Sequence, residues 1–135
     1  MDAQRMSAAR RCFEGAHEGT MSFPAIVGTL IDAGFEGYVV DYRRHRTSYF
    51  LPDGECLELE HPSSSDRVAP AFDQAAIRAQ VAWAQANPPD YAYAAFSRNV
   101  MAAGCAGYVV SFPGRRVLYF GRTAETHTEH FPQQG

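Results

Sequence analysis

The sequence lacks a long apolar run, a paired-cysteine motif and a large excess of charge of either sign. No stretch approaches the roughly 18 consecutive apolar residues that a membrane-spanning helix requires. The first residues have no continuous apolar segment behind their charges, so a secretory signal is not predicted. The formal net charge of −3 provides no general attraction to nucleic acid or to an anionic membrane. These absences predict a cytoplasmic protein with neither a nucleic-acid nor a membrane partner.

Cysteine is scarce, and its three positions, Cys12, Cys56 and Cys105, are far apart in the chain. Because no CxxC pair is present, neither a zinc knuckle nor a thioredoxin-like redox site is predicted. We expect all three to be buried, reduced thiols that pack as small apolar side chains. The sequence therefore predicts no metal and no cofactor.

Short motifs of common enzyme classes are also absent from the sequence. It contains no serine elbow, no cysteine–histidine signature and no HExxH helix. Gly34 and Gly37 follow a predicted helix, whereas a phosphate-binding loop would follow a strand. The absence of these motifs leaves open whether the protein is an enzyme.

Apolar residues are numerous enough for one hydrophobic core. They make up 46% of the 135 residues, and charged residues make up 20%, a balance typical of a globular chain. The length is close to the commonest domain size. Residues 1–135 are therefore predicted to form a single domain.

The clearest pattern is an internal repeat with a spacing of seventy residues. In this alignment residues 21–62 and 91–132 share twelve identities in forty-two positions, where chance at ordinary composition gives about two or three. The longest identical run, Gly-Tyr-Val-Val, occupies residues 37–40 and 107–110. Two copies are too few for a solenoid, so the repeat predicts one duplicated domain with a pseudo-twofold axis.

Each copy predicts two helices followed by three strands. Apolar residues recur at helical spacing in residues 6–16 and 76–86. Ser22 and Asp73 are predicted helix N-caps, and Gly34 is predicted to be left-handed after a helix. The pattern then changes to β-branched and aromatic residues separated by turns. The predicted strands are residues 38–42, 46–51, 55–60, 108–112, 116–121 and 125–131.

The predicted fold class is α+β. It is a tandem duplication of a helix–helix–three-stranded antiparallel meander unit with a pseudo-twofold axis, and helices cover the sheet on one face. The copies occupy residues 1–62 and 71–132. Residues 63–70, which contain several serines and prolines, are predicted to form a linker.

The last predicted strand contains the strongest candidates for catalysis. Strand alternation places Glu125, His127 and Glu129 on one face. Without a gap in the repeat, His127 and Glu129 replace Leu57 and Leu59, and a buried His–Glu pair could act in acid–base chemistry or bind a metal. A register shifted by one residue places them in solvent, on an ordinary edge strand. The sequence leaves both interpretations open.

Two pairs of repeated residues are candidates for ligand binding. Arg46 and Arg116 follow turns rich in basic residues, and an arginine fork suits a phosphate or a carboxylate. Tyr38 and Tyr108 could line an apolar pocket between the sheet and the helices. The alternative interpretation is that the arginines are solvated turn residues and that the tyrosines belong to the core.

Several segments match the pattern of a known family. They are residues 103–110 and 116–122, with Glu125 and residues 129–132, and Asp41, Tyr49, Gly54 and Glu55 in the first half. Together they resemble the bacterial DUF1398 family, whose members are often labelled phage envelope protein. Ser111 and Ala124 depart from the acidic residue and the glycine that the family pattern has there. The resemblance implies a bacterial, phage-linked origin and supplies no catalytic residues.

These observations support three functional hypotheses. The first is a non-enzymatic intracellular module that binds a small molecule, such as an anion, or a protein. The second is an enzyme that uses Glu125, His127 and Glu129. The third is a phage-related structural or assembly protein. We expect a monomer or a small homo-oligomer.

Overall fold

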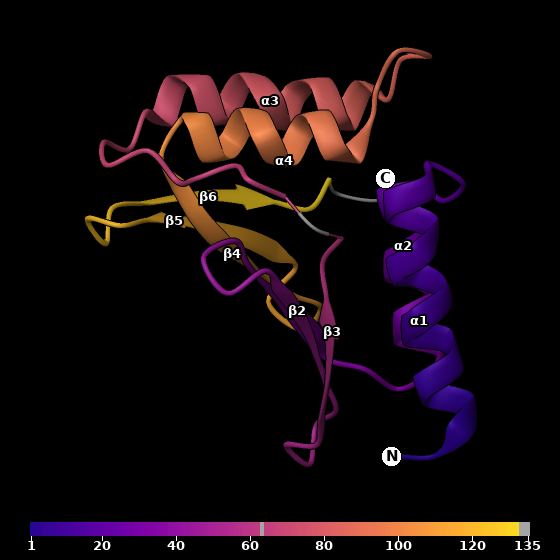
Figure 1. The fold of residues 1–135 in the computed structure, drawn as a ribbon. Helices are drawn as coiled ribbons and strands as arrows, with labels where there is room; N and C mark the ends of the chain where they lie inside the picture. Colours follow the sequence, from indigo (N-terminus) through magenta and orange to yellow (C-terminus); the bar gives the residue numbers. More distant parts are fainter. Residues whose placement is uncertain (63, 133–135) are drawn as a thin grey trace.

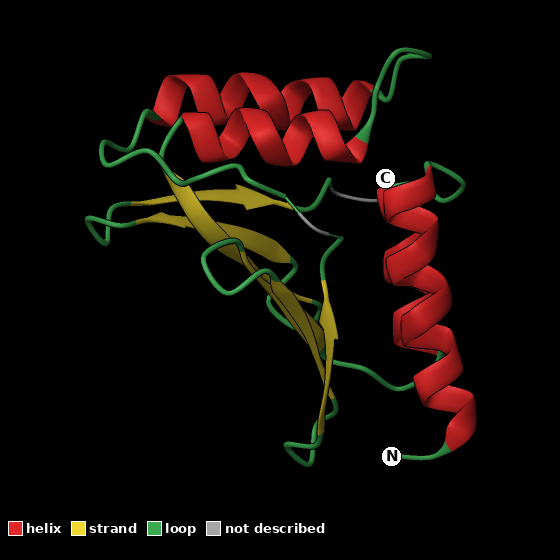
Figure 2. Cartoon of the chain, viewed as in Figure 1, coloured by secondary structure: helices red, strands yellow, loops and turns green. Residues whose placement is uncertain are grey.

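The computed structural model describes residues 1–62 and 64–132, which form four α-helices and a six-stranded antiparallel sheet (Figures 1 and 2). The helices are α1 (Ala3–Glu18), α2 (Phe23–Asp32), α3 (Gln74–Ala86) and α4 (Tyr93–Ala102). The strands are β1 (Gly37–Asp41), β2 (Arg46–Phe50), β3 (Cys56–Glu60), β4 (Cys105–Ser111), β5 (Arg116–Gly121) and β6 (Thr126–His130). The predicted α+β class is confirmed.

Both predicted helix N-caps and the predicted left-handed glycine are present. The side chains of Ser22 and Asp73 accept hydrogen bonds from backbone N–H groups in the first turns of α2 and α3, which satisfies donors that have no partner within the helix. Asn87 ends α3 in a left-handed conformation. Gly34 has a φ of 95°, a conformation that glycine adopts without steric cost.

The sheet has the strand order β3-β2-β1-β4-β5-β6, so each meander contributes one half. The halves meet where β1 pairs with β4, and Val39 lies opposite Val109 at the centre of this pairing. Tyr38 pairs with Tyr49 in the first meander, and Tyr108 pairs with Tyr119 in the second, seventy residues later.

The outer strands also pair in corresponding registers. Arg46 lies opposite Glu60, and Arg116 lies opposite His130. His127 therefore occupies the position in β6 that Leu57 occupies in β3. The alternative register for the last strand, shifted by one residue, is wrong.

The two faces of the sheet differ in burial. On one face, which we call the buried face, side chains such as Tyr38, Val40 and Tyr108 are at most 7% exposed. On the other, which we call the open face, Val109 is 37% exposed. Strand alternation thus separates a core side from a side that faces solvent.

The helices lie in two pairs (Figure 1). The helices α3 and α4 lie together above the β5–β6 half of the sheet, and α1 and α2 lie together beside β3. The pairs touch where α1 contacts α4. No helix in residues 1–62 and 64–132 is long and apolar enough to cross a membrane.

The predictions for the cysteines and for the linker have different outcomes. Cys12 and Cys105 are buried, but Cys56 is exposed, because it lies on the open face at the edge strand β3. The prediction that all three thiols are buried is therefore wrong for Cys56. In the predicted linker, residues 64–70 form neither helix nor strand. Ser63 and residues 133–135 lie outside the described residues.

The β1–β4 pairing leaves no room for a side chain at Gly107. A Cβ there would collide with the backbone oxygen of Val40 and would lie 2.8 Å from Cζ of Phe120. We expect Gly107→Ala to lower the free energy of unfolding by about 1–3 kcal/mol.

The control is Gly28→Ala, because a Cβ at this exposed position in α2 meets nothing within 4 Å. It should raise the free energy of unfolding by about 0.5–1 kcal/mol. Urea denaturation measures both, and equal stability of the two variants would contradict the tight pairing.

Candidate functional site

The predicted pair in the last strand is formed, and it lies on the buried face. His127 is 7% exposed, and its Nε2 lies 2.7 Å from Oε1 of Glu129, whose side chain is 28% exposed. Glu125 lies outside β6, is exposed, and its carboxylate accepts a hydrogen bond from the hydroxyl of Thr123 at 2.9 Å. The structure therefore brings together His127 and Glu129, but not Glu125. The interpretation of this strand as fully solvated is wrong for His127.

Gln74, the first residue of α3, completes this group. Its amide Nε2 lies 2.9 Å from Nδ1 of His127. The two ring nitrogens of His127 thus bridge Gln74 and Glu129. We call Gln74, His127 and Glu129 the Glu129 site.

The four ligand-binding candidates do not form one site. Arg46 and Arg116 lie on the open face. They pair with Asp41 and Ser111, which strand alternation places on the same face as Val109. Arg46 forms an ion pair with Glu58 of the neighbouring strand, with 3.4 Å between nitrogen and oxygen. Tyr38 and Tyr108 lie on the buried face. An anion held by the arginines would therefore not contact the tyrosines.

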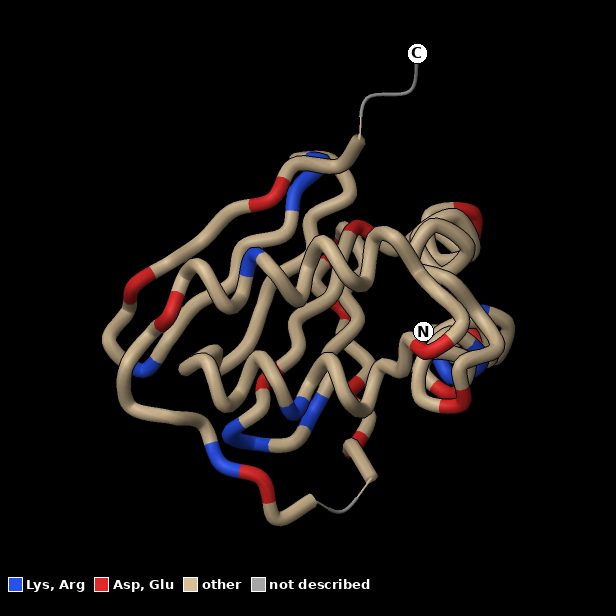
Figure 3. Tube along the Cα trace, turned by 90° about the horizontal axis from the view of Figure 1, so that it is seen from above, with Lys and Arg blue, Asp and Glu red and all other residues tan. Residues whose placement is uncertain are grey.

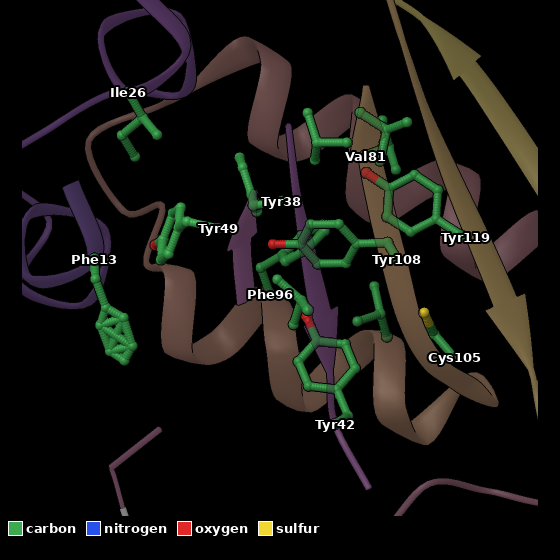
Figure 4. Close-up of a cluster of buried hydrophobic side chains, with 14 of the residues drawn as sticks. Phe13, Ile26, Tyr38, Tyr42, Tyr49, Val81, Phe96, Cys105, Tyr108 and Tyr119 are labelled. Carbon is green, nitrogen blue, oxygen red and sulfur yellow. The ribbon is translucent and has the colours of Figure 1, made fainter. Parts of the chain in front are cut away.

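Four tyrosines form a row across the buried face (Figure 4). The ring centroids are 5.4 Å apart for Tyr49 and Tyr38, 6.4 Å for Tyr38 and Tyr108, and 5.3 Å for Tyr108 and Tyr119. Burial raises the pKa of all four hydroxyls, so they are uncharged at neutral pH. The ring of His127 stacks 6.4 Å from that of Tyr119 and continues the row to the Glu129 site.

A second polar group lies where α1, α4 and the sheet meet, and it contains two histidines. His17 Nδ1 lies 2.8 Å from the carbonyl oxygen of Phe13, which can only accept, so Nδ1 donates a proton to it. His61 Nε2 lies 2.7 Å from Oγ1 of Thr47. The two imidazole centroids are 5.9 Å apart.

Hydroxyl groups extend this cluster toward β1 and β4. The hydroxyl of Tyr93, at the start of α4, lies 2.7 Å from that of Tyr108. The hydroxyl of Tyr42 donates to Oγ of Ser97 at 3.2 Å. The rings of His17 and Tyr93 pack edge to face, with centroids 5.2 Å apart. We call the whole cluster the polar junction; its members are His17, Tyr42, Thr47, His61, Tyr93, Ser97 and Tyr108.

The charge state of His61 follows from its surroundings. Burial lowers its pKa to about 4, and the neighbouring His17 and His45 add to this effect. The imidazole of His61 is therefore uncharged at neutral pH. The histidines and Tyr93 of the polar junction are half-buried, so the cluster reaches the surface.

The sequence did not reveal the polar junction, because its members come from five separate segments. A signal was nevertheless present in the internal repeat. Seventy residues after Thr47 and His61 lie Val117 and Phe131. A search for positions that are polar in only one copy would have found these residues.

Metal binding and known relatives give no further assignment. Within the described part of the chain, no group of three His, Cys, Asp or Glu residues is placed to hold a metal ion. No protein-family model matches the chain, and no curated protein gives a significant match. The resemblance to the DUF1398 family therefore stays a prediction.

The lowered pKa of His61 predicts an acid-sensitive fold. Between about pH 6.5 and pH 4 the unfolded chain binds a proton that the folded protein does not. Stability should therefore be complete above pH 6.5 and should fall by about 2 kcal/mol on acidification to pH 4, after allowance for partial exposure. Urea denaturation at a series of pH values measures this loss.

The variant His61→Gln should reduce this acid dependence, because glutamine can bond Thr47 without titrating. The exposed His130 provides the control, and His130→Gln should leave the dependence unchanged. If the free energy of unfolding fell equally with pH in the wild-type protein and in His61→Gln, a group other than His61 would cause the acid dependence.

Proposed function

We propose that the protein is a binding module for a small uncharged molecule, which binds at the polar junction. The observation that carries the proposal is the hydrogen-bonded set of hydroxyls and imidazoles between α1, α4 and the sheet. Among the described residues no buried side-chain nitrogen or oxygen lacks a hydrogen-bond partner, so these groups satisfy one another. A core made of apolar side chains needs no cluster of this kind.

The proposal includes a duplication of residues 1–62 and 71–132 about a pseudo-twofold axis, with the helices covering the buried face. It is supported by backbone bonds that recur after seventy residues. The N–H of Tyr42 donates to the oxygen of Ala106 at 2.9 Å, and that of Phe112 donates to the oxygen of Glu36 at 3.0 Å. On this view the molecule has two equivalent junctions between helices and sheet.

The two junctions differ in polarity. At the second one Phe23 and Phe131 pack edge to face, with centroids 5.8 Å apart. These residues correspond to Tyr93 and His61 in the repeat. Since the apolar junction satisfies the same architecture, stability does not require the hydroxyl and imidazole groups. We attribute them to ligand binding.

The chemistry of the polar junction favours an uncharged ligand. His61 remains neutral at pH 7, and burial raises the pKa of Tyr42 and Tyr93. Hydrogen-bonding groups beside the rings of Phe13 and His17 suit a flat molecule with both donors and acceptors. The ligand class that we propose is a small phenol, nucleoside or sugar.

Acid–base catalysis is not part of this proposal. The enzyme hypothesis names Glu125, His127 and Glu129; His127 and Glu129 lie together, and Glu125 lies apart from them. Membership of the DUF1398 family, a cytoplasmic location and a bacterial origin are included as predictions. A phage-assembly protein is the alternative, and it predicts self-association through an exposed sheet edge.

Ligand-detected NMR with phenol, catechol, thymidine and glucose tests the proposal. We expect at least one of these compounds to bind the wild-type protein, and we expect the double variant His61→Phe, Tyr93→Phe to bind it at least tenfold more weakly. This variant places at the polar junction the residues of the apolar one, so the fold has a precedent in the same chain.

The control is Arg46→Ala, because Arg46 lies on the open face. It should leave binding unchanged. The single variant Tyr93→Phe, which removes one hydroxyl, provides a second test should the double variant unfold. Unchanged binding in the folded variants, or no binding of any compound to the wild-type protein, would contradict the proposal.

A further inference from the structure

We infer that the Glu129 site binds an organic cation, a primary ammonium group, through the carboxylate of Glu129. This site consists of residues other than those of the polar junction, and the inference does not depend on the function proposed there. It rests on three features of the described residues: a fixed carboxylate, the lack of an arginine partner for that carboxylate, and a polar group where the other half of the molecule is apolar.

The carboxylate of Glu129 is held in place by a chain of hydrogen bonds. His127 is hydrogen-bonded to Gln74 of α3 at 2.9 Å and to Oε1 of Glu129 at 2.7 Å. The imidazole at the centre of this chain is buried. Among the described residues Oε2 has no hydrogen-bond partner, and the side chain is 28% exposed. One carboxylate oxygen is thus fixed, and the other is available to a ligand.

Among the described residues, the ion pairs include no arginine partner for Glu129. Arginine, aspartate and glutamate positions are distributed along the chain (Figure 3), and several acidic side chains have cationic partners. Glu55 pairs with the amino group of Met1 at 2.8 Å, and Glu58 pairs with Arg46 at 3.4 Å. The partner of Glu129 within 4.0 Å is the imidazole of His127. A ligand ammonium group would place a full positive charge beside the free carboxylate oxygen.

The fold itself does not require this polar group. In β3 the positions that correspond to His127 and Glu129 hold Leu57 and Leu59, which pack against the core. Two leucines would bury more apolar surface than a histidine and a glutamate, and would need no hydrogen bonds. The presence of His127 and Glu129 in place of leucines in β6 puts a preformed carboxylate on an edge strand, where a ligand can reach it.

Titration of the full chain with n-butylammonium chloride at constant ionic strength tests the inference. The reporters are the NMR signals of the His127 ring and the Gln74 side-chain amide. We expect saturable shifts of both signals, and no shifts with n-butanol, which has the same chain without the charge. We expect Glu129→Gln, which retains an acceptor for His127, to bind at least tenfold more weakly.

Two further variants keep the test decisive. Glu58→Gln removes an exposed carboxylate of the open face and should leave the affinity unchanged. The double variant His127→Leu, Glu129→Leu copies β3 and should fold without binding n-butylammonium. The polar-junction variant His61→Phe, Tyr93→Phe should bind it normally, which separates this inference from the proposed function. Equal shifts with n-butanol, equal affinity in Glu129→Gln, or no saturable shift would overturn the inference.

Discussion

The pairing of β1 with β4 is the interaction on which the rest of the structure depends. A three-stranded meander with one apolar face is barely stable alone, and this pairing joins two of them into one six-stranded sheet. It also brings Tyr38 of one half beside Tyr108 of the other, with ring centroids 6.4 Å apart. The continuous aromatic row, and with it the core between sheet and helices, exists because these two strands meet.

Both candidate sites lie where one half of the molecule departs from the other. In the first half Thr47 and His61 are polar, and the corresponding Val117 and Phe131 are apolar. In the last strand the second half is the polar one, because a histidine and a glutamate stand where β3 has two leucines. The duplication that we propose would leave one half free to maintain stability while the other acquires polar groups. The sites that we propose follow from these differences.

Much of the fold could be predicted, because its signals are local. Alternating aromatic and β-branched residues indicate the strands, and the Ser22 and Asp73 caps mark helix starts. The polar junction could not be predicted, because His17 and His61 meet only through tertiary packing. Gln74 and His127 are likewise fifty-three residues apart. Cys56 was expected in the core because the sequence does not show which strand lies at an edge.

Native-state hydrogen exchange at the two backbone bonds that cross from one half to the other tests the central claim most directly. The amides of Tyr42 and Phe112 donate to Ala106 and Glu36 at 2.9 Å and 3.0 Å. The account predicts that both exchange only through global unfolding, with the same free energy that denaturation measures. Exchange of either amide at a clearly lower free energy would mean that the halves separate before they unfold, and would contradict it.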